Sequence, residues 1–189
     1  MTAPLLPRPR PPAHRRRATA PLAPLVLVAA LVSCGAPAPP RAARLPDGTR
    51  GLAATVTHVV DGDTVDLDLG GATERARLLG IDTPETVKPD APVDCFGPEA
   101  SARTKVLVPP GTDVLVQRDR EPRDRYGRLL LYVWRRSDGL FVNEALVRDG
   151  FARTLFIAPN TARRPALTAA AATARASGAG LWSTCPPDG

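Results

Sequence analysis

At residues 77–86 the chain reads Arg77-Leu78-Leu79-Gly80-Ile81-Asp82-Thr83-Pro84-Glu85-Thr86. Side chains alternate along a regular strand, so Arg77 and Asp82 would point to opposite faces of a sheet. They can share a site only if the strand ends near Gly80. Gly80 and Pro84 favour such an end, because both residues interrupt strands. We therefore expect Asp82 and Thr83 to leave the sheet as a loop whose oxygen atoms can bind a metal ion.

Two further segments carry charged residues at strand ends. Asp61-Gly62-Asp63-Thr64 precedes the first stretch, and Asp124-Arg125-Tyr126-Gly127-Arg128 follows it by about forty residues. A glycine between two aspartates allows a sharp turn that can direct Asp63 into a pocket. Taken alone, this turn would be read as a simple hairpin. It is not a calcium loop of the EF-hand kind, because Asp66 and Ala72 occupy positions that need Gly and Glu.

Together the three segments, in this order, resemble the thermonuclease family, the staphylococcal-nuclease-like phosphodiesterases. The resemblance covers residues 52–184. It implies that the carboxylates of Asp63 and Asp82 and the backbone carbonyl of Thr83 hold a Ca²⁺ ion. Oxygen-only ligation suits a hard cation and leaves positions open for substrate.

The same resemblance assigns roles in catalysis. It implies that Glu85 is the general base and that Arg77 and Arg128 donate to the phosphate oxygens as negative charge develops. Arg125 and Tyr126 are the expected substrate-binding residues. One departure from the family concerns tyrosines that follow its second helix, which are replaced here by Phe156 and Ala158. Base stacking is worth roughly 1–3 kcal/mol, so this change predicts weaker substrate binding with the hydrolytic residues intact.

The arrangement of predicted elements favours an α+β fold. Strands are predicted at 54–60, 64–69, 75–81, 113–118 and 129–134, and helices at 98–107, 142–149 and 165–177. Strands that come first, with helices interleaved late, argue against a parallel sheet. Five short strands can close into the small barrel called the OB-fold. The family resemblance implies that fold, a five-stranded OB-fold β-barrel with three helices.

The amino-terminal third predicts export. Residues 1–33 hold five arginines, no acidic residue and an apolar run from Leu22 to Val32, which is the pattern of a signal peptide. Leu31-Val32-Ser33-Cys34 is similar to a bacterial lipobox, so Cys34 is the predicted lipidation site. An ordinary cleaved signal, with Ala36-Pro37-Ala38 at the cut, and an uncleaved anchor are the alternatives. Residues 34–51 are predicted to be a Pro/Ala/Arg-rich tether, and residues 52–189 the folded domain.

Net charge does not select a partner. The whole chain carries +6, but without residues 1–33 it holds 20 basic and 19 acidic residues. A nucleic-acid argument must therefore rest on where the arginines lie. Cysteine usage agrees with export. If Cys34 is the lipidation site, Cys95 and Cys185 are left as an even pair, which can form a disulfide in an oxidising compartment. Two unpaired thiols are the alternative.

These observations predict an exported, monomeric, Ca²⁺-dependent nuclease. It is expected on the outer face of the cell membrane as a lipoprotein, or secreted, with DNA and perhaps RNA as its substrate. In-line attack by water would give 3′-phosphate ends. The main alternative is a non-catalytic nucleic-acid-binding OB-fold module on an envelope lipoprotein, since the same fold binds oligonucleotides without cutting them. A structural lipoprotein is the third hypothesis.

Overall fold

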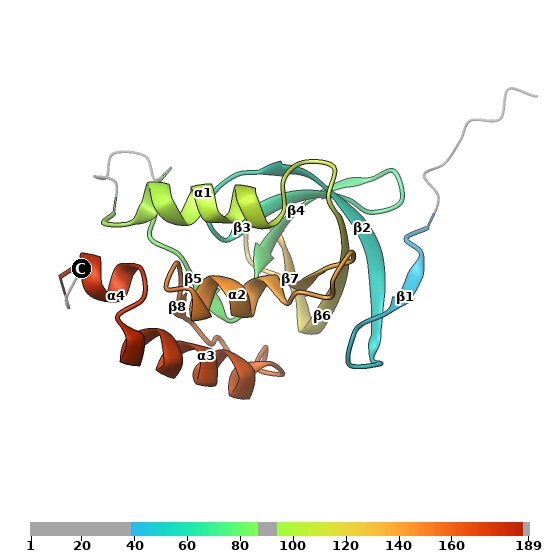
Figure 1. Ribbon diagram of the computed structural model, residues 1–189. Helices are drawn as coiled ribbons and strands as arrows, with labels where there is room; N and C mark the ends of the chain where they lie inside the picture. The colour runs from blue at the N-terminus through green and yellow to red at the C-terminus, as the bar shows by residue number, and fades with distance from the viewer. Residues whose placement is uncertain (1–38, 87–93, 187–189) are drawn as a thin grey trace, which may run out of the picture. The chain divides into compact units, whose positions relative to one another are not determined.

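The computed structural model describes residues 39–86 and 94–186 (Figure 1). The predicted signal peptide at 1–33 and the predicted lipidation site, Cys34, lie outside the described residues. Among the residues that are described, no helix combines the length and the apolar character needed to cross a membrane.

Most strands belong to one mixed sheet. Its members are β1 (Ala42–Arg44), β2 (Arg50–Val59), β3 (Thr64–Asp68), β4 (Thr73–Leu78), β6 (Asp113–Arg123) and β7 (Leu129–Arg135). The strand order is β1-β2-β3-β4-β7-β6, and β2 pairs with β6 as well as with β3. The pairings therefore run around five strands and return to β2. The predicted α+β OB-fold with five strands is confirmed.

Three helices lie along one side of these strands (Figure 1). They are α1 (Gly97–Leu107), α2 (Val142–Arg148) and α3 (Arg164–Ser177), and α2 contacts both of the others. Pro98 and Pro165 stand in the first turns of α1 and α3, where a missing N–H costs nothing. The short helix α4 (Leu181–Thr184) follows α3, and its Leu181 is buried.

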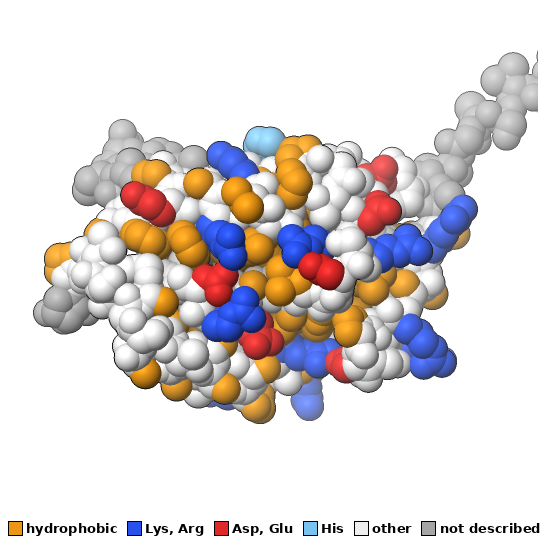
Figure 2. Space-filling model, viewed as in Figure 1, with side chains coloured by type: hydrophobic (Ala, Val, Ile, Leu, Met, Phe, Trp, Pro, Cys, Tyr) orange, Lys and Arg blue, Asp and Glu red, His pale blue; other side chains and the backbone are white. Residues whose placement is uncertain are grey.

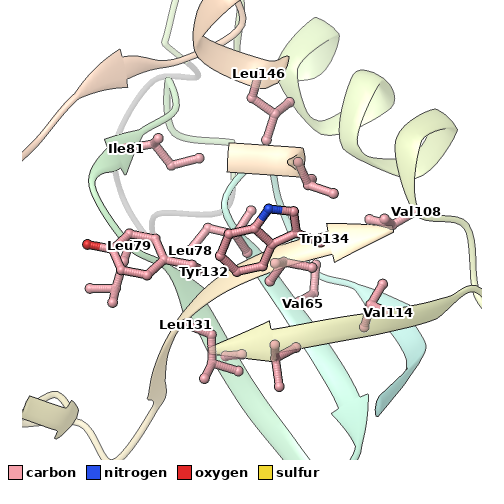
Figure 3. Close-up of a cluster of buried hydrophobic side chains, with 14 of the residues drawn as sticks. Val65, Leu78, Leu79, Ile81, Val108, Val114, Leu131, Tyr132, Trp134 and Leu146 are labelled. Atoms are coloured by element: carbon pink, nitrogen blue, oxygen red, sulfur yellow. The ribbon is translucent and has the colours of Figure 1, made fainter. Parts of the chain in front are cut away.

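The core fills the space between the strands and the helices (Figure 3). On β3 alternate residues point inward, since Val65 and Leu67 are both at most 1% exposed. Leu78, Leu131 and Leu146 bring β4, β7 and α2 into the same cluster. This packing fixes the ends of β3 and β4, where the charged segments lie.

The folded region begins earlier than the sequence predicted. Residues 34–51 were expected to form a tether, but β1 pairs antiparallel with β2 through Ala43 and Gly51. Leu45, directly after β1, is 3% exposed and belongs to the core. A Cβ atom at Gly51 would lie 2.9 Å from the Leu45 side chain, so the glycine permits this contact. The prediction was wrong for residues 42–51.

Candidate active site

The acidic turn between β2 and β3 buries one carboxylate. The Asp63 side chain is almost fully enclosed, with the residue 1% exposed. Its Oδ1 accepts hydrogen bonds from Arg77 Nη1 and from Thr64 Oγ1, and its Oδ2 accepts the backbone N–H of Thr83 at 3.0 Å. Burial raises the pKa of Asp63 to about 6, and the Arg77 guanidinium opposes that shift.

Arg77 joins the two aspartates of the predicted metal site. One guanidinium nitrogen, Nη1, donates to Asp63, and the other, Nη2, donates to Asp82 Oδ1 at 2.6 Å. The planar fork of arginine suits such a bridge between two carboxylates. The two acidic segments are therefore brought together, as the sequence predicted.

Gly80 and a short second sheet place Asp82. Gly80 has φ +77°, and a Cβ atom there would lie 2.4 Å from Leu167 Cδ1, so this turn needs glycine. β4 ends at Leu78, before Gly80, as the site requires. Asp82 was expected in a loop, but it belongs to β5 (Ile81–Asp82), which pairs with β8 (Arg153–Thr154). That part of the prediction was wrong, because the partner strand lies some seventy residues further along the chain.

Thr83 packs directly against the acidic turn. A Cβ atom at Gly62 would lie 2.6 Å from Thr83 Oγ1, so the absence of a side chain at Gly62 lets the two segments touch. Two helix residues that the sequence did not assign to the site hold the backbone of the acidic turn and of the residue after β4. Thr104 on α1 donates to the Gly62 carbonyl at 2.6 Å, and Asn143 on α2 donates to the Leu79 carbonyl at 2.9 Å. Both are buried, and no local sequence signal identifies their partners.

Glu85 is half-buried and follows Asp82 by three residues. Its Oε1 accepts the backbone N–H of Thr86 at 2.9 Å. Its own backbone N–H and C=O bond to Asp94, each at 3.0 Å. These two hydrogen bonds therefore connect the main chain of Glu85 to Asp94, which lies just before α1.

The third predicted segment forms a turn between β6 and β7. Asp124 Oδ2 accepts from Arg128 Nε at 2.7 Å, and Asp124 Oδ1 accepts the N–H groups of Tyr126 and Arg128. Arg128 directly precedes Leu129, which pairs with Ala76 in the parallel β4–β7 ladder. Arg77 pairs with Leu130 in that ladder, so it lies on the neighbouring strand two positions further along than Arg128.

An exposed ring stands over this turn. Tyr126 is 67% exposed, with the Arg125 guanidinium 4.7 Å and the Arg128 guanidinium 5.6 Å from its ring centre. Arg125 also donates to the Tyr126 hydroxyl at 2.5 Å. The turn therefore presents an aromatic face and two guanidinium groups on neighbouring residues, which suits binding of a base and of phosphate.

Comparisons with known proteins identify the family of the chain. Residues 75–184 match the family described as staphylococcal nuclease homologue. The chain belongs to this family. A thermonuclease of Staphylococcus intermedius is 43% identical over 133 residues, which cover 70% of this chain and 77% of the relative. A thermonuclease of Staphylococcus hyicus is 44% identical over 105 residues, covering 56% and 60%, and endonuclease YncB of Bacillus subtilis (strain 168) is 42% identical over 108 residues, covering 57% and 50%.

The donor set of this family member fits a hard cation. Asp63 and Asp82 supply carboxylate oxygens that one guanidinium already holds together, and the backbone of Thr83 lies against Asp63 Oδ2. Calcium takes such oxygen ligands. Within residues 39–86 and 94–186, no three His, Cys, Asp or Glu side chains cluster as a ready-made cage. A cation here would therefore rely on a carbonyl, water and substrate for its remaining ligands.

Phe156 does not present an open stacking face. Its ring packs against the core and lies under the Arg164 guanidinium, 4.6 Å from the ring centre. The exposed apolar residues of this loop are Leu155 and Ile157, and Ala158 is exposed as well.

On the face shown in Figure 2, basic and acidic side chains lie interspersed among apolar ones. The local arrangement of arginines, rather than net charge, is thus what can attract a nucleic acid.

The predicted disulfide is confirmed. Cys95 and Cys185 are bonded, with 5.9 Å between their α-carbons and 90 positions between them in the sequence. The bond joins the segment that follows Glu85 to the residue after α4.

Proposed function

We propose that this chain is a calcium-dependent nuclease that cuts DNA, and RNA where it is offered, by attack of water on phosphorus. The observation that carries the proposal is the Arg77 fork between the buried Asp63 and the exposed Asp82, with Glu85 three residues further on. The thermonuclease and endonuclease relatives support the class of reaction.

The roles follow from the chemistry of each side chain. Asp63, Asp82 and the Thr83 carbonyl would hold calcium, which supplies positive charge beside the phosphate when it is bound. Glu85 takes the proton of the attacking water. Arg77 and Arg128 donate to the phosphate oxygens, where a guanidinium is most valuable as negative charge grows. Tyr126 and Arg125 bind the part of the nucleic-acid substrate next to the phosphate that is cut.

The chemistry of the cut ends is part of the proposal. In-line attack with departure of the 5′-oxygen leaves a 5′-hydroxyl on one fragment and a 3′-phosphate on the other. A polynucleotide kinase should therefore label the new 5′ ends without prior phosphatase treatment.

The decisive experiment incubates the purified protein with single-stranded DNA or RNA, with calcium or with excess chelator. Shortened strands with calcium and none with chelator are expected. Full activity in chelator would remove the metal assignment. A strand that is retained but never shortened would instead favour the alternative, a non-catalytic OB-fold binding module.

We also propose that the protein is exported and anchored through a lipid on Cys34. The lipobox-like sequence Leu31-Val32-Ser33-Cys34 supports this, and so does a disulfide, which persists in oxidising compartments. Cys34→Ala should release the protein from the membrane fraction or block its processing. Unaltered protein found outside the cell, with its mature terminus downstream of Cys34, would favour an ordinary cleaved signal.

A further inference from the structure

One residue holds the main chain of Glu85 from both sides. Asp94 Oδ2 accepts the N–H of Glu85, and the N–H of Asp94 donates to the Glu85 carbonyl, each at 3.0 Å. The two residues are nine positions apart. Because both backbone polar groups of Glu85 are bonded to the same partner, this pair of bonds constrains the direction in which the Glu85 side chain leaves the backbone.

The first residue of α1 also contacts the backbone of Glu85. Gly97 donates its N–H to the Asp94 carbonyl at 3.0 Å. A Cβ atom on Gly97 would lie 2.9 Å from the Glu85 carbonyl oxygen and 2.8 Å from Thr86 Cγ2. The first turn of α1 is thus in direct contact with the backbone of Glu85, and a side chain at position 97 would displace it.

The turn that carries Asp94 is itself strongly anchored. Phe96 has φ +70°, a left-handed conformation that is unfavourable for a bulky residue and persists only where the surroundings enforce it. Its ring lies 5.2 Å from that of Phe151 on the segment after α2. Cys95, next to Asp94, is covalently bonded to Cys185. The ring contact and the disulfide therefore both fix this turn.

We infer that Asp94 is a positioning residue for Glu85 and that the Cys95–Cys185 disulfide keeps Asp94 in place. The inference rests on the proposed role of Glu85 as the general base. A base must lie within hydrogen-bond reach of the water it deprotonates, and a misplacement of about 1 Å can cost about 100-fold in rate. Asp94 contributes by holding the backbone of Glu85, not by contacting substrate.

Three variants test the role of the Asp94 carboxylate. Asp94→Ala removes the acceptor for the Glu85 N–H, whereas Asp94→Asn keeps an oxygen that can accept it. Asp68→Ala is the matched control, since Asp68 Oδ1 accepts the Gly71 N–H at 2.6 Å in the turn between β3 and β4. We expect kcat to fall about 10- to 100-fold in Asp94→Ala with KM within about twofold, to recover largely in Asp94→Asn, and to stay unchanged in Asp68→Ala.

A double variant separates positioning from a general structural effect. If Asp94 acts through Glu85, Asp94→Ala should cause no further loss in a Glu85→Gln background. An equal loss in both backgrounds would overturn the inference, and so would a normal kcat in Asp94→Ala. Should Asp94→Ala fail to fold, Gly97→Ala replaces it, because the added methyl group displaces the same backbone.

Hydrogen exchange supplies a measurement that does not depend on activity. The Glu85 amide should exchange faster in Asp94→Ala and in the Cys95→Ser/Cys185→Ser double variant than in the unsubstituted protein, and Asp68→Ala should leave it unchanged. Unchanged exchange in both variants would overturn the inference. The two proposals can fail separately. If the unsubstituted protein cuts no nucleic acid but the Glu85 amide still exchanges faster in the two variants, the proposed function is refuted and the contact between Asp94 and Glu85 is supported.

Discussion

At the scale of single residues, the ionisation of Asp63 makes the free energy of unfolding depend on pH. Its folded-state pKa of about 6 lies above the ordinary 3.8 because burial disfavours the charged carboxylate. The stabilising contribution of the protonated form is complete below about pH 4 and is lost as the pH rises through about 6. In chelator, we expect this residue to lower the free energy of unfolding by about 2–3 kcal/mol between pH 4 and pH 7.

Urea unfolding at several pH values checks this expectation. Asp63→Asn serves as the comparison, because an amide cannot ionise and its variant should lack this component of the pH dependence. The difference between the two curves reports the ionisation of Asp63 together with its interaction with the neighbouring Asp61 and Asp82 carboxyl groups. Parallel curves would contradict the assignment. Calcium should restore stability at the high end of the range in the unsubstituted protein only, because it binds the charged carboxylate.

Arg77 tests whether the guanidinium fork matters. Arg77→Lys keeps the positive charge but cannot bond both Asp63 and Asp82 in the same planar geometry. We expect kcat to fall by about 100-fold or more, as for loss of a transition-state donor, with the protein still folded. Arg75→Lys is the matched control on the same strand, since Arg75 pairs with Asp66 and has no assigned role. Equal activity of both variants would remove Arg77 from the mechanism.

The sequence was sufficient to identify the charged residues but not what holds them. Asp63, Asp82 and Glu85 were singled out because the segments that carry them resemble the thermonuclease family, and the turn residues beside them agreed with that resemblance. Asn143 and Thr104 could not, because each donates to a backbone carbonyl more than forty positions away. Such partners depend on how helices pack on the strands, which no local pattern encodes. Asp94 was missed for a different reason, because its bonds to Glu85 depend on the turn before α1.

At the scale of elements, the same limit explains the errors. The five strands and three helices could be predicted because their apolar periodicity and their Pro and Gly boundaries are strong. β1 was missed because residues 42–44 have no such pattern and are extended only through pairing with β2. β5 was missed because two residues are too few for a periodicity, and its partner β8 is equally short.

The contact between α1 and the acidic turn gives a prediction at this scale. Thr104→Val removes the hydroxyl that donates to the Gly62 carbonyl and leaves a buried acceptor without its partner. We expect a loss of about 1–3 kcal/mol in the free energy of unfolding and weaker calcium binding, because the turn that carries Asp63 loosens. Thr173→Val on α3 is the control, since Thr173 is exposed and bonds only within its own helix. Unchanged calcium affinity in Thr104→Val would show that α1 does not support the turn.

At the scale of the whole molecule, the disulfide joins regions that the strands alone leave separate. Cys95 precedes α1 and Cys185 follows α4, so the bond links the two ends of the helical side. This pairing could be predicted because Cys95 and Cys185 are the two cysteines left once Cys34 is set aside as the predicted lipidation site, and because export was predicted. Its relation to the site was not, because it depends on Asp94 lying against Glu85.

Removing this bond should destabilise the entire domain. A cross-link that closes a loop of 90 residues lowers the entropy of the unfolded chain, and the chain-entropy model gives about 4–5 kcal/mol. Cys95→Ser/Cys185→Ser should therefore lower both the free energy of unfolding and the melting temperature. Thermal unfolding of the oxidised protein with and without a reductant provides a second measurement on the unsubstituted chain. The double variant should not respond to the reductant, which separates cleavage of this bond from other effects of the reagent. The four samples are the unsubstituted protein and the double variant, each with and without reductant. The same melting temperature in all four would show that the cross-link adds no stability. Its remaining role would then be to keep Asp94 beside Glu85.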